Sequence, residues 1–302
     1  MTSKVSYHDT VLLKESIDHL GVEENGVYVD VTYGGGGHSK ELLSRVANCS
    51  VFAFDQDEDA LKNDVKDDRL VLIHSNFSEL EMNLKMYQGV PADAILADLG
   101  VSGHQFDEGS RGFSIRMDEE LDMRMSKQIA VSAKELLEKS EKEEVIQFLR
   151  ENSDLRRVGV IADAIKYHQG QGRMNTTGDL VNAVKKFSQR GKENSFLAQV
   201  FQAVRMKVND EINVLKDMLQ QSLNVLKPGG KLVVISYHSL EDRLVKNFMK
   251  TGNFDGEIKT DLFGVSQAPM KMETRKPIVP SEEELGRNNR SRSAKLRVAV
   301  KK

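Results

Sequence analysis

Four consecutive glycines, Gly34 to Gly37, stand between an acid, Asp30, and a histidine, His38. The residues before the glycines, Val27 to Thr32, are apolar and β-branched, which is typical of a buried strand. A helical pattern follows, so the glycines form a turn between a strand and a helix N-terminus. Because glycine has no Cβ atom, this turn lets the backbone approach a ligand closely. The pattern favours a nucleotide-like cofactor in the first crevice of a doubly wound sheet, although a flexible loop would give the same run.

Two further acids end predicted strands at the same edge of the sheet. Asp55 follows the glycines by about 20 residues, the spacing expected of an acid that binds ribose hydroxyls. Asp98 closes a later apolar run and opens onto the same crevice. The G-x-G-x-x-G spacing of dinucleotide-binding loops is not met, because no glycine follows His38 in the helix. S-adenosylmethionine, an adenosine cofactor without phosphates, therefore fits at least as well as NAD.

The composition describes a globular chain that is not basic overall. Its 302 residues suffice for a sizeable core and one or two domains, and the net charge of −3 means that any nucleic-acid surface must be local. Cys49 is the single cysteine, which excludes a disulfide framework and indicates an inert core thiol. With no run of 18 apolar residues and no signal peptide, we expect a cytoplasmic protein that has no membrane partner.

Strands alternate with helices in both terminal parts of the chain, which predicts a parallel sheet with covered faces. The predicted strands are Val27–Thr32, Val51–Asp55, Leu70–His74, Ala94–Asp98 and Lys231–Ser236, with a late edge strand at Lys295–Val300. The intervening part shows only helical runs, at Val131–Lys139, Glu141–Arg150, Val158–Tyr167, Leu180–Phe187 and Phe196–Val208. We predict an α/β domain of residues 1–106 and 208–302 that is interrupted by a helical insertion, residues 107–207.

Local signals refine this outline. Ser140 and Glu143 form a predicted capping box, and Ser239 is a predicted N-cap. Phe77, at the end of the third strand, suits either an adenine contact or a core position.

Two cationic stretches are candidates for RNA contact. The segment from Arg111 to Met125 mixes arginine, aromatic and methionine residues, which suits unstacked bases and phosphates, although an irregular loop packed on the insertion is the more common meaning. The C-terminal tail contains seven cations and no acid, for which a solvated tail is the default explanation. We nevertheless expect the arginines just before the edge strand Lys295–Val300 to face a ligand or phosphate. The seven cations are Arg287, Arg290, Arg292, Lys295, Arg297, Lys301 and Lys302.

Several blocks in the same order resemble the bacterial small-subunit ribosomal RNA cytosine-N4 methyltransferases over nearly the whole chain. The blocks are Asp30–His38, Asp98–Ser102, Arg111–Ser114, Leu121–Met125, Phe201–Arg205, Val208–Glu211, Ile235–Arg243 and Ser291–Arg297. The resemblance implies a class I methyltransferase fold with a helical insertion, and methyl transfer from S-adenosylmethionine to one cytidine in the decoding region of 16S ribosomal RNA. It places the cofactor contacts at Gly36, Gly37, His38, Asp55, Phe77, Asp98 and Gln105. The sequence departs from the family pattern at Val31, Gly35, Gly103-His104, Ala198–Val200 and Asn289.

The chemistry requires a cytosine amine held in line with the methyl group, in a site that accepts hydrogen bonds from the amine. Our hypothesis is that Asp98 lies at the methyl-transfer edge, in contact with cofactor or amine, and that Tyr237 stacks on or borders the cytosine. A structural role is expected for His238. Two alternatives remain open from the sequence: a NAD-dependent oxidoreductase and a non-catalytic RNA-binding assembly factor.

Overall fold

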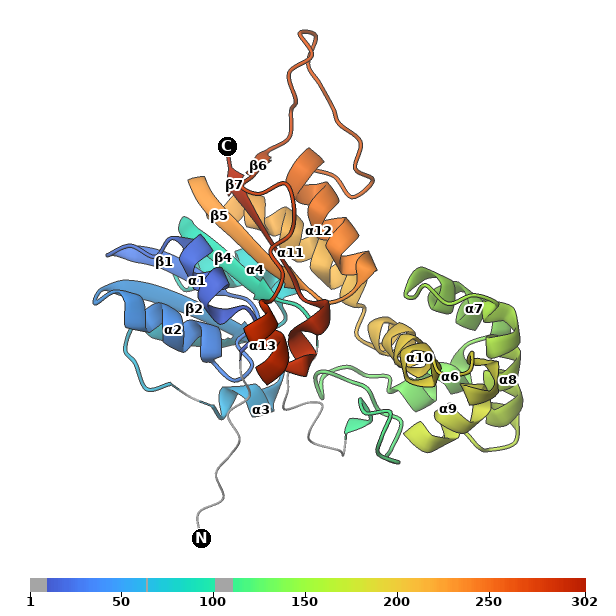
Figure 1. Ribbon diagram of the computed structural model, residues 1–302. Helices are drawn as coiled ribbons and strands as arrows, with labels where there is room; N and C mark the ends of the chain where they lie inside the picture. Colours follow the sequence, from blue (N-terminus) through green and yellow to red (C-terminus); the bar gives the residue numbers. More distant parts are fainter. Residues whose placement is uncertain (1–9, 64, 101–110) are drawn as a thin grey trace. The chain divides into compact units, whose positions relative to one another are not determined.

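The computed structural model describes residues 10–63, 65–100 and 111–302, and its chain forms two compact units (Figure 1). Unit 1 consists of residues 1–100 and 213–302, and unit 2 of residues 101–212. Unit 1 contains all the named strands, whereas the named elements of unit 2 are helices. No helix among the described residues is long and apolar enough to cross a membrane.

A seven-stranded sheet forms the centre of unit 1, with the strand order β3-β2-β1-β4-β5-β7-β6. The first five strands of that order run parallel, and β7 runs antiparallel to both its neighbours. The strands are β1 (Gly26–Asp30), β2 (Cys49–Asp55), β3 (Leu70–His74), β4 (Ala92–Asp98), β5 (Leu226–Ser236), β6 (Met270–Met272) and β7 (Lys295–Lys301). The predicted α/β fold is confirmed.

The prediction of an edge position for the last strand is wrong. β7 lies between β5 and β6, and the edge is β6, a strand of three residues. Such a short strand leaves no alternating pattern in the sequence from which it could be predicted.

Alternate residues of the strands face two separate apolar cores. Val29, Ile95 and Val234 belong to the core that includes residues of α4, α11 and α12, whereas Tyr28 and Leu96 belong to the core with residues of α1 and α2. This division follows from the period of two in an extended strand. Helices on both faces bury the central strands of the sheet, which explains their continuous apolar runs.

The helices of unit 1 connect successive strands or follow them. They are α1 (Leu13–Leu20), α2 (Gly37–Arg45), α3 (Glu58–Leu61), η1 (Phe77–Glu79), α4 (Leu80–Met86), α11 (Glu211–Val225, which begins in unit 2), α12 (Ser239–Thr251), α13 (Glu282–Arg287) and η4 (Asn289–Ser293).

Unit 2 has its own apolar core, built from buried residues of its helices and of the segment before them. The helices are α6 (Ala133–Lys139), α7 (Lys142–Glu151), α8 (Val158–Gly170), α9 (Thr177–Val184), η3 (Lys185–Phe187) and α10 (Glu193–Val208). Leu137, Phe148 and Leu180 are almost fully buried in this core.

Two predicted helix caps are shifted by one residue. Ser140 ends α6, where its N–H donates to the carbonyl of Leu136, and α7 has its capping box at Glu141 and Glu144. The helix α12 is capped by His238, and Ser239 is its first helical residue.

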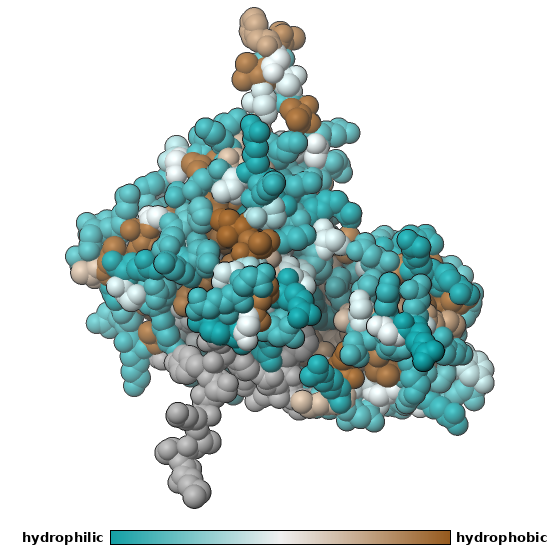
Figure 2. Space-filling model, viewed as in Figure 1, coloured by the Kyte–Doolittle hydropathy of each residue, from teal (hydrophilic) through white to brown (hydrophobic). Residues whose placement is uncertain are grey.

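An arm of residues 255–268 extends between α12 and β6 (Figure 1). Its tip is apolar and exposed, as the brown atoms at the top of Figure 2 show. Leu262 is 100% exposed and Phe263 90% exposed.

Candidate active site

The carboxyl ends of β1 and β4 mark the point at which the strand order of unit 1 reverses. β1 pairs with β2 on one side and with β4 on the other, so the connections diverge here. Asp30, Asp55 and Asp98 end β1, β2 and β4. Ligands of open parallel sheets bind at such a reversal, outside the carboxyl ends of the strands.

The glycine turn packs tightly against the residues around it. Gly34 and Gly36 have positive φ angles of 52° and 72°. A Cβ atom on Gly37 would lie 1.9 Å from the hydroxyl of Thr10, whereas one on Gly35 would meet nothing within 4 Å. Gly37 is therefore required by packing, whereas the space beside Gly35 is open.

The carboxylate of Asp55 is held by two backbone donors. The N–H of Gly34 donates to Oδ2 and the N–H of Asp57 donates to Oδ1, both at 2.8 Å. Burial raises the pKa of Asp55 to about 6. Each oxygen keeps a second lone pair, so this carboxylate can also accept hydrogen bonds from ribose hydroxyls.

Asp30 has a structural role in the turn. Its side chain is 1% exposed, accepts from the hydroxyl of Ser39 at 2.7 Å and accepts from the N–H of Thr32 at 3.1 Å. These bonds join the end of β1 to the first turn of α2, which fixes the glycines between them.

Asp98 and Tyr237, the two residues of the catalytic hypothesis, lie in contact with each other. The phenol of Tyr237 donates to Oδ1 of Asp98 at 2.7 Å, and the N–H of Asp98 donates to the hydroxyl of Thr32 at 2.7 Å. Burial raises the pKa of Asp98 to about 6, although the phenol counteracts part of that rise. Burial and the adjacent carboxylate raise the pKa of Tyr237, so the phenol keeps its proton as a donor.

His38 is buried beneath the glycine turn. Its Nε2 lies 3.2 Å from the carbonyl of Val11, which can only accept, so Nε2 is the protonated nitrogen. Burial lowers the pKa of His38, and the imidazole is therefore neutral. This bond ties α2 to the segment before α1.

A buried acid holds the backbone of Tyr237. The N–H of Tyr237 donates to Oε2 of Glu241 at 3.1 Å, and Oε1 of Glu241 lies 2.9 Å from Nε2 of His238. Glu241 is 4% exposed and lies in the first turn of α12. The helix N-terminus therefore fixes the backbone of Tyr237, and His238 has the structural role expected of it.

Phe77 begins a short 3-10 helix after β3 and is half-buried against the core on one face of the sheet. The side chain of Asn76 caps this turn and donates to Gln56, just beyond β2. Phe77 is thus placed near Asp55, where either of its predicted roles is possible. Gln105, another predicted cofactor contact, lies outside the described residues.

The site is strongly negative, which suits a cationic ligand. The charges of Asp30 and Glu241 both raise the pKa of Asp98, in addition to the effect of burial. Within the described residues, no lysine or arginine pairs with Asp98 or Asp55. A sulfonium cation beside Asp98 would supply the missing positive charge, so the donor set fits S-adenosylmethionine.

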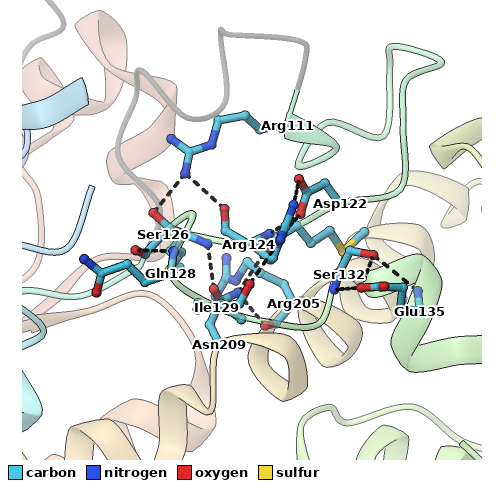
Figure 3. Close-up of polar contacts among 12 residues, drawn as sticks. Arg111, Asp122, Arg124, Ser126, Gln128, Ile129, Ser132, Glu135, Arg205 and Asn209 are labelled. Atoms are coloured by element: carbon cyan, nitrogen blue, oxygen red, sulfur yellow. Dashed lines mark hydrogen bonds and ion pairs between the residues drawn. The ribbon is translucent and has the colours of Figure 1, made fainter. Parts of the chain in front are cut away.

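In unit 2, two arginines of the candidate RNA-contact segment, Arg111 and Arg124, hold the segment 111–130 in place (Figure 3). Arg111 donates to the carbonyls of Arg124 and Met125, and Arg124 forms a two-point pair with Asp122. Asn209 accepts from the N–H of Met125 and donates to the carbonyl of Met123. The structure supports the interpretation of a loop packed on the insertion.

Sequence reasoning missed three residues that support the site, Thr32, Ser39 and Glu241, and in unit 2 it missed Asn209, which holds the segment 111–130. Ser39 and Glu241 carried a signal, because each occupies the first turn of a helix that follows a strand end. The contacts of Thr32 with Asp98 and of Asn209 with Met123 and Met125 carried none, because these partners lie 66 to 86 positions away in the chain.

The strand order, the antiparallel β7 and the acids at the strand ends define a class I S-adenosylmethionine-dependent methyltransferase. The chain belongs to the MraW methylase family, whose model matches residues 5–302. Of the three activities left open by the sequence, family membership confirms the methyltransferase.

Curated relatives match the chain over its full length. A protein of Phocaeicola vulgatus is 47% identical over 99% of both chains, and one of Bacteroides thetaiotaomicron is 48% identical over 99% of both. Each is named ribosomal RNA small subunit methyltransferase H. A putative methyltransferase of Streptococcus mutans, solved in complex with SAH, is 14% identical and aligns with a TM-score of 0.44 over 97% of this chain and 99% of that one.

Proposed function

We propose that this methyltransferase transfers a methyl group to the N4 amine of one cytidine in the decoding region of 16S ribosomal RNA. The observation that supports it most directly is the pair of Asp98 and Tyr237, a hydrogen-bond acceptor beside an aromatic ring at the strand reversal. The names of the full-length relatives support the RNA substrate.

The cofactor is held by residues of three strand ends. Asp55 accepts the ribose hydroxyls, the backbone of Gly36 and Gly37 lines the amino-acid end, and Phe77 packs on the adenine. His38 supports the glycine turn from beneath through its bond to Val11. When bound, S-adenosylmethionine supplies a methyl group that is activated by the positive sulfur.

The amine of cytosine is a poor nucleophile because its lone pair is shared with the ring. Asp98 accepts a hydrogen bond from the amine and so favours the pyramidal geometry that exposes the lone pair. Tyr237 keeps the carboxylate of Asp98 oriented and borders the base. Holding the two reactants in line supplies roughly 7–11 kcal/mol of barrier reduction at best.

The helical insertion, unit 2, recognises the RNA by shape around the target nucleotide. Its own core keeps this unit rigid, as shape recognition requires. The substrate is a nearly complete small ribosomal subunit in the cytoplasm.

The test is mass spectrometry of ribosomal RNA from cells that lack this protein. One cytidine of the 16S RNA should lose a single methyl group, and the wild-type gene should restore it. The Asp98→Asn variant should not restore it, even at equal protein abundance. A full complement of methyl groups in the deletion strain would refute the proposal.

A further inference from the structure

We propose that Arg287 and Arg292 form a phosphate-binding surface for the RNA strand beside the active site. This inference rests on the proposed function, and it assigns part of the RNA contact to unit 1 rather than to the insertion alone.

Three of the seven cations of the tail contact other groups of unit 1. Arg297 is 4% exposed and forms a two-point pair with Asp242 at 2.6 and 3.1 Å. Lys295 lies 3.5 Å from the same carboxylate, and Lys301 donates to the carbonyls of Leu223 and Leu226. These three cations contact groups within unit 1, and Arg297, which is buried, is not available to RNA.

Arg287 and Arg292 are exposed, and neither pairs with an acid within the described part of the chain. Arg287 ends α13, and Arg292 lies in η4. The η4 turn is anchored by Ser291, which is fully buried and donates to the carbonyl of Asn288 at 2.7 Å. A fixed backbone therefore presents Arg292 to solvent, which lowers the entropy lost on binding a phosphate.

The location of these arginines links them to the active site. The first residue of β7, Lys295, pairs with Ser236 at the end of β5, so η4 lies at the same edge as Tyr237. The buried Glu284 of α13 accepts from the N–H of Leu12 at 2.9 Å, next to the Val11 that contacts His38. The surface over α13 is hydrophilic in Figure 2.

A solvated charge run is the usual explanation of such a tail, but Arg292 lies in a turn whose neighbouring residues Ser291 and Ala294 are buried, so its backbone is held in place. The chain is negative overall, so a fixed cationic patch at the site edge is a local feature. Glu283 lies one turn before Arg287 on α13, but the two form no ion pair within the described part of the chain, and residues 288–302 contain no acid. Arginine at a fixed position is well suited to the phosphates that set the register of a nucleic acid.

The experiment compares the double variant Arg287→Gln/Arg292→Gln with a matched control, Lys271→Gln/Lys302→Gln. The control removes two exposed cations near the last residues of β7, at the end of the sheet opposite to Tyr237. Binding of small ribosomal subunits from the deletion strain is measured between about 50 and 200 mM salt, together with kcat, KM and affinity for S-adenosylmethionine.

Losing two phosphate contacts should make the slope of log affinity against log salt less steep by about 1.4. Between about 50 and 200 mM salt, the factor by which affinity falls should therefore be about sevenfold smaller for the variant than for the wild type. The variant should also bind RNA more weakly, with a raised KM, while kcat and the affinity for S-adenosylmethionine stay unchanged. The control should keep the wild-type slope.

Equal slopes and KM values for variant, control and wild type would overturn the inference while leaving the proposed function intact. A wild-type protein that binds S-adenosylmethionine but methylates no subunit would overturn both.

Discussion

At the residue scale, the site contains buried carboxylates whose negative charge is disfavoured by their removal from water. Burial raises the pKa of Asp55 and of Asp98 to about 6, and in the described structure no lysine or arginine pairs with either carboxylate to offset that rise. The folded protein therefore bears an electrostatic cost that a cationic cofactor would offset. Such costs are typical of active sites, where function and stability conflict.

Replacing Asp98 by Asn should stabilise the protein at neutral pH in the absence of cofactor. Above pH 6 the carboxylate is ionised in both the folded and the unfolded protein, and its burial disfavours the folded state. A rise of the pKa from 3.8 to about 6 corresponds to at most about 3 kcal/mol in the free energy of unfolding. As the pH falls through 6 toward 4, the folded protein takes up the proton and the gain should disappear.

Urea unfolding of Asp98→Asn and wild type at pH 7.5 and at pH 4.5 measures this difference. Asp67→Asn is the control with opposite sign, because Arg69 lowers the pKa of Asp67 to about 2 and its charge favours the folded state. A stability gain for Asp98→Asn that is equal at both pH values would contradict the electrostatic explanation.

Replacing Tyr237 by Phe should shift the pH dependence of methyl transfer. The phenol donates to the ionised carboxylate of Asp98 and so lowers its pKa, which means that the variant should have a higher pKa. The acid limb of the rate profile should then move up from about 6 by roughly one pH unit. At pH 7 the rate should therefore fall only about twofold; the loss should approach tenfold near pH 5.5 and disappear by pH 8.5.

Single-turnover rates between pH 5.5 and 9 provide the measurement for Tyr237→Phe. A loss that is uniform across this range would indicate that the phenol acts only through packing.

At the element scale, the site depends on how the strand–turn–helix unit of β1 and α2 packs. Asp30, Ser39 and Thr32 close the turn from within, and Thr10 closes it from the segment before α1. The turn is therefore rigid before any cofactor arrives, which reduces the entropy lost on binding.

Replacing Gly37 by Ala should destabilise this element, because its Cβ would overlap the hydroxyl of Thr10. The expected loss is about 1–3 kcal/mol in the free energy of unfolding, with weaker binding of S-adenosylmethionine. Gly35→Ala is the matched control and should leave stability unchanged, since open space surrounds that position. Adding Thr10→Ala to Gly37→Ala should restore part of the loss.

Denaturant unfolding of the four proteins tests the packing argument. Equal losses for Gly35→Ala and Gly37→Ala would show that the overlap with Thr10 is not the cause of the destabilisation.

At the scale of the whole molecule, two units with separate cores share one chain. Unit 1 is discontinuous, and the chain leaves it after Gly100 and re-enters it at Asn213. Separate cores allow the units to unfold independently, so one stability value does not describe the protein.

Calorimetry should therefore resolve two unfolding transitions, and S-adenosylmethionine should raise the midpoint temperature of only one of them. A ligand at 100 times its Kd stabilises the unit that binds it by about 2.7 kcal/mol. Leu180→Ala, a substitution in the fully buried core of unit 2, should lower the other transition only. A single transition that responds to both changes would show that the two cores unfold as one.

The sequence alone determined the local features of this protein: the five parallel strands, the helical insertion, the glycine turn and the acids at the strand ends. These follow from hydrophobic period and from residue chemistry, which act over a few neighbours. Only the tertiary structure decided features that depend on partners distant in the chain. It placed β7 inside the sheet, joined Tyr237 to Asp98 across 139 positions, and assigned three of the tail cations to contacts within unit 1. Such contacts depend on how elements pack, and a linear pattern of residue types does not encode which carboxylate a given phenol or guanidinium will meet.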